Sequence, residues 1–348
     1  RITTWGETHG AGVGVVVDGC PAGLPLERED VQKYLDRRKP GQSKYTTQRK
    51  EGDQVEILSG IFEGRTTGTP ISMVVYNKDQ RSKDYSNIKD IYRPGHADFT
   101  FDMKYGFRDY RGGGRSSGRE TIGRVAAGAV AAKVLKELGI EIKAYAKAIA
   151  GIEVSKDHFD FAEMNNNPFN MPDKEAAKLV QEKADQMIKE MDSIGGIIEC
   201  QITGMPVGIG ETVFDKLDAE LSKAIMSIGS VKGFEIGDGF EAANLRGSEN
   251  NDDFICVDGK VEKETNHSGG VLGGMSDGSA IVFRAAIKPT PSIAQTQKTV
   301  NRDLDNVEIE IHGRHDPMIV PRAVVVVESM AAVTILDGVL KNLGATMD

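Results

Sequence analysis

The run from Arg111 to Glu120 combines three consecutive glycines with flanking arginines and leads into the clearest helix of the sequence. Glycines leave backbone amides open to a ligand, and the positive end of the following helix would point at the same place. The run is not a Walker A loop, because Gly118-Arg119-Glu120 stands where Gly-Lys-Ser or Gly-Lys-Thr is needed. A glycine-rich turn with solvated arginines explains it about equally well, although Ser116 and Ser117 favour a small-anion site.

A second candidate anion site is Lys288-Pro289-Thr290-Pro291-Ser292, which follows a predicted strand. A lysine and hydroxyl groups at a strand end suit a phosphate. From composition alone, however, an ordinary proline-rich turn is the better explanation. The glycine-rich segment from Gly269 to Gly278 predicts a surface on which a planar ring system lies, or equally a flexible lid.

Histidines supply candidate acids and bases, although a lone histidine is more often structural than catalytic. His9 lies between small residues just before a predicted strand, and His96 follows Arg93-Pro94-Gly95. A histidine beside an arginine and a rigid turn is well placed to protonate an anionic leaving group. We assign no role to His158. The six histidines are His9, His96, His158, His267, His312 and His315.

The run Gly313-Arg314-His315-Asp316-Pro317 lies between two predicted strands. Arg314 can hold a carboxylate or phosphate through two parallel hydrogen bonds, and Asp316 offers a base beside it. A surface salt bridge in a turn is a common alternative for such a pair.

Hydrophobic periodicity predicts the elements that must position these side chains. The run Ser117-Gly118-Arg119-Glu120 predicts a capping box at the start of the main helix. The order mixes strands and helices without the regular alternation of a doubly wound fold, which favours one α+β domain over residues 1–348 rather than a Rossmann fold. The predicted strands span 13–17, 55–58, 71–76, 197–202, 280–287, 307–311 and 323–327, the helices span 27–38, 117–138, 174–192, 219–228 and 328–343, and 77–93 is a loop.

Composition narrows the class of ligand. The 348 residues carry a net charge of −9, which argues against nucleic acid and anionic membranes as partners. Two tight basic segments, 37–50 and 104–124, fit a small anion better than a polymer. Three distant cysteines, with no Cys-x-x-Cys, predict no disulfide framework or zinc site and a reducing, cytoplasmic setting. We expect no signal peptide, no apolar run as long as a membrane span, and a short missing segment before Arg1.

Taken together, these runs resemble the chorismate synthase family. The resemblance rests on Gly6-Glu7-Thr8-His9-Gly10, Arg93-Pro94-Gly95-His96-Ala97-Asp98 and Arg111-Gly112-Gly113-Gly114-Arg115-Ser116-Ser117, and extends to about residue 330, most weakly over 150–192. It implies antiparallel sheets packed with helices in a β-α-β sandwich. It also implies a 1,4-anti elimination that converts 5-enolpyruvylshikimate 3-phosphate to chorismate and phosphate, with reduced FMN and no net redox change.

The resemblance also implies roles for individual residues. His9 would act beside the reduced flavin, His96 would protonate the departing phosphate, and Asp316 would assist proton removal from the ring. The implied substrate-binding residues are Arg38, Lys44, Arg49, Arg93, Ser117, Arg119 and Arg314. The implied FMN-binding residues are Arg115, Ser116, Ser117, Gly229, Ser230, Gly273, Lys288, Pro289, Thr290, Pro291, Ser292 and Arg314.

The resemblance further implies a homotetramer of the monofunctional type, for which NADPH would be an indirect reductant used by a separate flavin reductase. Three departures from the family pattern are Lys44 for arginine, Thr8 for serine and Gly118 for alanine. A lysine keeps the charge of arginine but loses its planar guanidinium group, so a contact of Lys44 with the substrate or the nucleotide is left open. Two alternatives are an FMN-dependent oxidoreductase, for which no Gly-x-Gly-x-x-Gly follows a strand, and a non-enzymatic binder of a phosphorylated metabolite.

Overall fold

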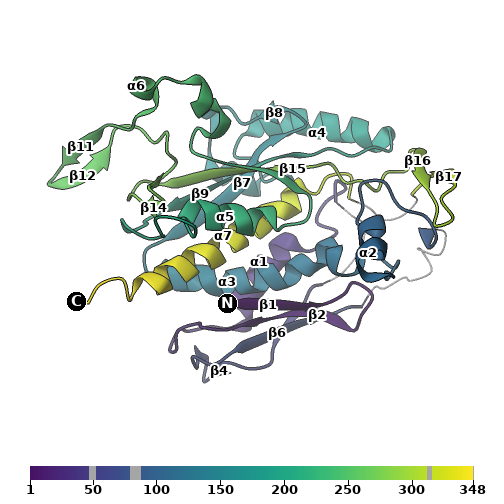
Figure 1. Cartoon of the computed structure of the whole chain (residues 1–348), viewed down its shortest axis with the longest axis horizontal. Helices are drawn as coiled ribbons and strands as arrows, with labels where there is room; N and C mark the ends of the chain where they lie inside the picture. The colour runs from purple at the N-terminus through teal and green to yellow at the C-terminus, as the bar shows by residue number, and fades with distance from the viewer. Residues whose placement is uncertain (47–51, 79–87, 312–315, 348) are drawn as a thin grey trace.

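Two antiparallel sheets enclose a layer of helices in the computed structural model of the chain, which describes residues 1–46, 52–78, 88–311 and 316–347 (Figure 1). The first sheet has the order β1-β2-β6-β3, and the second has the order β10-β15-β9-β7-β8. The first sheet consists of β1 (Ile2–Gly6), β2 (Gly12–Val17), β6 (Ile71–Tyr76) and β3 (Val55–Ile57), and the second of β10 (Val231–Ile236), β15 (Ile281–Ile287), β9 (Gly196–Thr203), β7 (Glu141–Ile149) and β8 (Ile152–Glu153).

Helices α3 (Thr121–Glu137) and α7 (Val320–Asn342) lie side by side between the two sheets, with α1 (Arg28–Arg38) and α5 (Leu217–Met226) beside them (Figure 1). Their apolar side chains join those of both sheets in one continuous core. Helix α4 (Lys174–Lys189) lies near β8 at the far side of the second sheet, and α2 (Asp98–Tyr105) stands at one end of the molecule. The predicted α+β fold of antiparallel sheets packed with helices is therefore confirmed.

The strand predicted over residues 323–327 is wrong, because these residues lie in the first half of α7. Valine runs favour strands when one face of a sheet is buried. Here Val324 to Val327 are all buried, since α7 is surrounded by α3, α5 and the second sheet. Tertiary packing on every side of the helix outweighs the weak strand preference of the individual valines.

Helix α7 also corrects the expectation that no apolar run is as long as a membrane span. By length and composition alone it could cross a membrane, with a mean hydropathy of 2.0 in its most apolar window. More than half of that window, 56%, is buried inside the protein. A helix enclosed by protein on most sides must be apolar on most sides, so its composition follows from its place in the core.

Other predicted elements agree with the structure to within a few residues, including β2, β6, α1, α4, α5, β9 and β15. The sequence patterns gave no strand for β1, β7 or β10 and no helix for α2. Outside the two sheets, the described residues also form the hairpins β4 (Ile61–Phe62) with β5 (Arg65–Thr66), β11 (Phe254–Val257) with β12 (Lys260–Lys263), β13 (Val271–Leu272) with β14 (Met275–Ser276) and β16 (Gln297–Val300) with β17 (Asn306–Ile309), and the short helix α6 (Gly247–Asn250).

Candidate functional site

The glycine-rich loop at the start of α3 contacts several residues of the candidate site. Gly112, Gly113 and Gly114 all have positive φ angles, which suit glycine far better than other residues. At Gly112 a Cβ atom would lie 2.9 Å from Cδ2 of His9, so the imidazole rests directly on the loop. The predicted capping box is only half formed, because Ser117 Oγ accepts from the amide of Arg119 whereas Glu120 accepts from Arg124.

Two arginines meet at one buried carboxylate beside this loop. Arg38 at the end of α1 donates from Nη1 to Oδ2 of Asp53 at 2.7 Å, and Arg119 donates from Nη1 to Oδ1 of the same group at 2.9 Å. The Asp53 side chain is fully buried. Arg38 also donates to Oγ1 of Thr121 and to the carbonyl of Gly118, which fixes the end of α1 against the start of α3.

Charge in this cluster is not balanced. Arg38, Arg119 and Arg322 bring three guanidinium groups, and Asp53 and Asp316 bring two carboxylates, so these five side chains carry one excess positive charge. Burial, together with the charges of Arg322 and Arg119, lowers the pKa of Arg38 to about 10, although the charges of Asp53 and Asp316 oppose the shift. A buried excess of positive charge is stabilised when an anion lies beside it, which favours an anionic ligand here.

Asp316 joins the same cluster through Arg322 in the first turn of α7. Nη1 of Arg322 donates to Oδ2 of Asp316 at 2.7 Å, and its Nε donates to the backbone carbonyl of Arg38 at 3.0 Å. Both side chains of the pair are largely buried. One guanidinium therefore ties the carboxylate predicted as the base to the end of α1.

The loop Glu7 to Gly10, which carries His9, is fixed to Arg119 by Asn77. Nδ2 of Asn77 donates to the carbonyls of Glu7 and Gly10, both at 2.9 Å, and its Oδ1 accepts from Nε of Arg119 at 2.5 Å. Close by, hydrogen bonds from the side chain and the backbone amide of Arg111 lower the pKa of Asp109. Burial opposes this shift, whereas the charges of Arg111 and His9 add to it. His9, Arg119, Arg38 and Asp316 thus belong to one connected group.

His96 lies in a second group, built from two loops far apart in the sequence. Its Nε2 atom is 2.7 Å from Oγ of Ser292, and Nζ of Lys288 donates to the carbonyl of Gly95 at 2.8 Å. A Cβ atom at Gly95, where φ is +71°, would lie 2.7 Å from Cβ of Pro291, so only glycine lets the loops approach this closely. Burial and the charge of Lys232 lower the pKa of Lys288.

Residues Ser193 and Ile194 connect the two groups. Oγ of Ser193 donates to the carbonyl of Thr290 at 2.6 Å, while the amide of Ile194 donates to the carbonyl of Pro317 at 3.0 Å. The Lys288–Ser292 loop and the segment after Asp316 therefore lie on two sides of the same short stretch. We take the two groups together as the candidate site, because the adjacent residues Ser193 and Ile194 each contact a segment that belongs to one of them.

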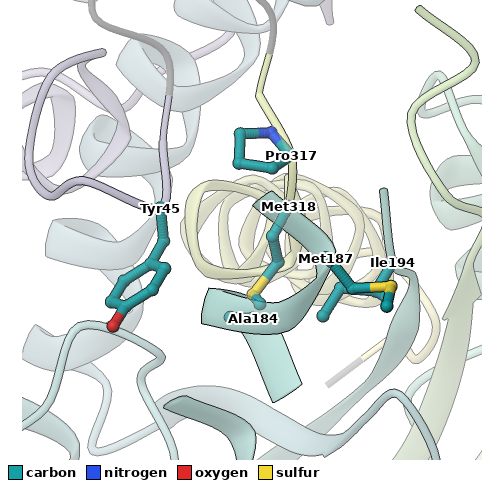
Figure 2. Close-up of a pocket in the computed structure, with 6 residues that line it drawn as sticks. All are labelled: Tyr45, Ala184, Met187, Ile194, Pro317 and Met318. Atoms are coloured by element: carbon teal, nitrogen blue, oxygen red, sulfur yellow. The ribbon is translucent and has the colours of Figure 1, made fainter. Parts of the chain in front are cut away.

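A small apolar pocket borders the site without forming its centre. Figure 2 shows Tyr45 and Pro317 facing it from two chain segments, with Met187 and Ile194 from two others. None of its six lining residues carries a charge, so the pocket does not suit an anion. The lining residues are Tyr45, Ala184, Met187, Ile194, Pro317 and Met318.

Several residues named from the sequence lie apart from the connected group or are held by other contacts. Lys44 has a largely exposed side chain, 62% accessible, and pairs with Asp185 of α4 at 2.8 Å. Gly273 lies in the β13–β14 hairpin, which contacts the start of α5, whereas Gly229 and Ser230 follow the end of that helix. Arg49 and Arg314 lie outside the described residues.

Two predicted ligand-binding arginines already have protein acceptors. Arg93 donates from Nε and Nη2 to the carboxylate of Asp98, both at 2.8 Å, and is buried there. Arg115 donates to the carbonyl of Gly6 and to Oγ1 of Thr4, which ties the glycine loop to β1. Their contacts to substrate and FMN stay predictions.

Three residues of the site were missed from the sequence: Asp53, Asn77 and Arg322. Asp53 follows Gly52 just after the basic segment and has a positive φ of 43°, an unusual conformation that a single sequence does not reveal. Asn77 stands directly after a strong strand, and Arg322 lies in the first turn of α7. The available signal for Asn77 was a polar residue directly after an apolar strand, whereas Asp53 and Arg322 gave no comparable signal.

The donors of the second group fit the phosphate of a flavin nucleotide. Oγ1 of Thr290 is buried and has no hydrogen-bond partner within the described part of the chain, and the ammonium of Lys288 and the hydroxyl of Ser292 lie on the same loop. Oγ1 of Thr8, the residue before His9, is likewise buried and has no hydrogen-bond partner among the described residues. No group of three or more metal-ligating side chains occurs among the described residues. These features suit a phosphorylated organic cofactor better than a metal ion.

An α+β sandwich that gathers arginines, His9 and two carboxylates near a glycine-rich helix start defines the class: an enzyme that acts on a small polyanion. A family model described as chorismate synthase matches residues 1–340. The chain is 68% identical to a chorismate synthase of Lachnospira eligens and 66% identical to one of Agathobacter rectalis, in each case over 100% of this chain and 95% of the relative. A solved structure described as a chorismate synthase covers 99% of this chain and 92% of its own, with a TM-score of 0.79 and 31% identity. The chain belongs to the chorismate synthase family, and it is accordingly a carbon–oxygen lyase of the shikimate pathway.

Proposed function

We propose that the chain catalyses the 1,4-anti elimination of phosphate from 5-enolpyruvylshikimate 3-phosphate, which gives chorismate. The observation that carries the proposal is the buried Arg38–Asp53–Arg119 cluster, in which guanidinium groups outnumber carboxylates beside the glycine loop. The substrate has two carboxylates and a phosphate, so it needs several fixed cations. Arginine suits this task because its fork stays charged and matches oxyanions.

Reduced FMN is the proposed cofactor, and the Lys288–Ser292 loop would hold its phosphate. Ser230 supports this loop, because its carbonyl accepts from the Lys288 amide at 2.9 Å. When bound, reduced FMN would supply electron density that eases departure of the phosphate and is restored when the ring proton leaves. Support comes from the ammonium of Lys288 and from the hydroxyl of Thr290, which has no hydrogen-bond partner among the described residues. Arg115 and Gly273, by contrast, gain no support from their surroundings in the chain alone.

The residues of the chain have separate proposed tasks. The carbon–oxygen bond to phosphate breaks as a carbon–hydrogen bond breaks on the opposite face, so one proton must be delivered and one removed. His96, held by Ser292, delivers a proton to the departing phosphate oxygen. Asp316, held by Arg322, assists removal of the ring proton. Arg119 and its neighbours neutralise the charge that develops as phosphate leaves.

Assembly, location and reductant are further parts of the proposal. We propose a homotetramer in the cytoplasm, with no nucleic-acid or membrane partner. Its flavin would be reduced by a separate enzyme that uses NADPH. The net charge of −9 supports the absence of a nucleic-acid partner. Gel filtration with light scattering would contradict the tetramer if the purified chain ran as a monomer.

The test is an anaerobic assay of the purified chain with dithionite-reduced FMN and 5-enolpyruvylshikimate 3-phosphate. Phosphate and chorismate should form over many turnovers while the flavin stays reduced. Oxidation of one flavin for each product would instead indicate an FMN-dependent oxidoreductase. Substrate binding without any product would indicate a non-enzymatic binder.

A further inference from the structure

The side chain of Asn77 is the direct contact between the loop that carries His9 and an arginine of the anion cluster. Asn77 follows the last residue of β6, and its own amide donates to the carbonyl of Ala11 at 3.1 Å. The backbone on both sides of the contact is thereby fixed by the first sheet, because β6 pairs with β2 along its whole length. The position of the Asn77 side chain follows from the sheet rather than from a loop.

The hydrogen bonds of Asn77 require an amide. Its Nδ2 donates to two backbone carbonyls, those of Glu7 and Gly10, while its Oδ1 accepts from the Arg119 guanidinium. A carboxylate can accept from the arginine but cannot donate to carbonyls, and a hydroxyl has only one proton to donate. Within the amino acids of similar size, only asparagine meets all three partners.

The two carbonyls that Asn77 holds are those that shape the histidine loop. The amide of Gly10 donates to the carbonyl of Glu7 at 3.1 Å, so the loop is a tight turn with His9 inside it. The imidazole is pressed against Gly112, with a Cβ at that position only 2.9 Å from Cδ2. A shift of the turn would therefore move the imidazole across the glycine loop.

On its other side, Asn77 orients Arg119. The Nε of this arginine is taken by Asn77 and one Nη1 proton by Asp53, and the side chain is largely buried. Two acceptors at different edges of a planar guanidinium fix both its direction and its rotation.

We propose that Asn77 is a positioning residue that holds His9 and Arg119 in a fixed mutual geometry for the elimination. The inference rests on the proposed function, since it concerns the same reaction. Asn77 acts only through its two partners and not by contact with the substrate or the cofactor. Loss of its donor function should therefore affect His9, while loss of its acceptor function should affect Arg119.

Asn77→Asp separates these two effects, because the carboxylate keeps the acceptor for Arg119 and replaces the donor to the carbonyls. Asn167→Asp is a matched control: Nδ2 of Asn167 also donates to two backbone carbonyls, those of Glu163 and Met171, and its side chain holds a loop other than the one that carries His9. We would measure the Kd for 5-enolpyruvylshikimate 3-phosphate by calorimetry without flavin, kcat for phosphate release with reduced FMN, and Tm for both variants.

Asn77→Asp should lower kcat at least tenfold and leave the Kd within threefold of wild type, whereas Asn167→Asp should change Tm only. In a His9→Ala background, Asn77→Asp should cause no further loss of kcat, because the two substitutions act through one group. Wild-type values of kcat in Asn77→Asp, or additive losses in the double variant, would overturn the inference.

If Asn77→Asp does not fold, Asn77→Ser removes both contacts without adding a charge. It should lower kcat at least tenfold and also raise the Kd, because Arg119 loses its acceptor. Wild-type kcat and Kd in Asn77→Ser would overturn the inference. A wild-type protein that fails to release phosphate would overturn the proposed function instead, so the two failures are distinct.

Discussion

The imidazole Nε2 of His96 lies 2.7 Å from the Oγ of Ser292, across a contact that joins positions 196 residues apart in the sequence. Gly95 makes the contact feasible, since any larger residue there would collide with Pro291. The hydroxyl fixes the ring at the place where two loops with candidate phosphate-binding groups meet. A proton donor for a departing phosphate needs this kind of fixed position.

Substitution of His96 tests that role. His96→Ala should lower kcat for phosphate release by about 10²- to 10⁴-fold, the usual contribution of a positioned general acid. FMN binding, followed by flavin fluorescence, should weaken far less. The control is His158→Ala, which removes an exposed histidine paired with Glu175. Equal losses of turnover and FMN binding in His96→Ala would indicate a structural histidine.

Asp316 and Arg322 give a second test. Asp316→Asn should keep the Kd for the substrate within threefold and lower kcat strongly, because the amide cannot take up the ring proton. Arg322→Gln should lower kcat less, by about tenfold, since it removes one charge-assisted hydrogen bond to Asp316 and leaves the carboxylate in place. Stopped-flow measurement of chorismate formation distinguishes the two. Turnover near the wild-type rate in Asp316→Asn would refute the assignment of the base.

The crossing of α3 and α7 sets the stability of the helical layer. A Cβ atom at Gly128 would lie 2.2 Å from Cβ of Ser329, so Gly128→Ala should lower the free energy of unfolding by about 1 to 3 kcal/mol. Gly118→Ala is the matched control, because nothing lies within 4 Å of its Cβ position. That variant should be slightly more stable, by about 0.4 to 1 kcal/mol. Urea denaturation measures both, and an undiminished Gly128→Ala would contradict the packing described.

Asp98 predicts part of the acid sensitivity of the fold. Burial raises the pKa of its carboxyl, but hydrogen bonds and charge from Arg93, with the charge of Arg108, outweigh burial and hold the pKa below its ordinary value. A lowered folded-state pKa contributes stability that is fully present above the unfolded value of about 3.9 and is lost as pH falls through the folded value.

Asp98→Asn should therefore cost about 3 to 5 kcal/mol near neutral pH, because it leaves Arg93 buried without its counterion. The difference in unfolding free energy between wild type and Asp98→Asn should shrink as pH falls below about 4. A difference that stays constant down to pH 2 would show that Asp98 is not the titrating group.

Much of the fold could be predicted from the sequence because its signals are local. The amphipathic pattern of 174–192 and the apolar runs of 71–76 and 280–287 specify a helix and two strands wherever they lie. The family resemblance likewise depends on short runs of adjacent residues, such as Gly6 to Gly10. Ser116 and Ser117 could be named as candidate site residues because they adjoin the glycine run in the sequence.

Other features required the tertiary structure, because they depend on residues distant in the chain. The helical state of 323–327 follows from burial on all sides in the central layer, which no window of residues reveals. The pairing of Asp53 with Arg38 and Arg119, and of Asn77 with the His9 loop, joins segments that meet only when α1 and the first sheet pack against α3. The sequence determined which chemical groups are present, and long-range packing decided which of them meet, since hydrogen bonds need contact in space and not proximity along the chain.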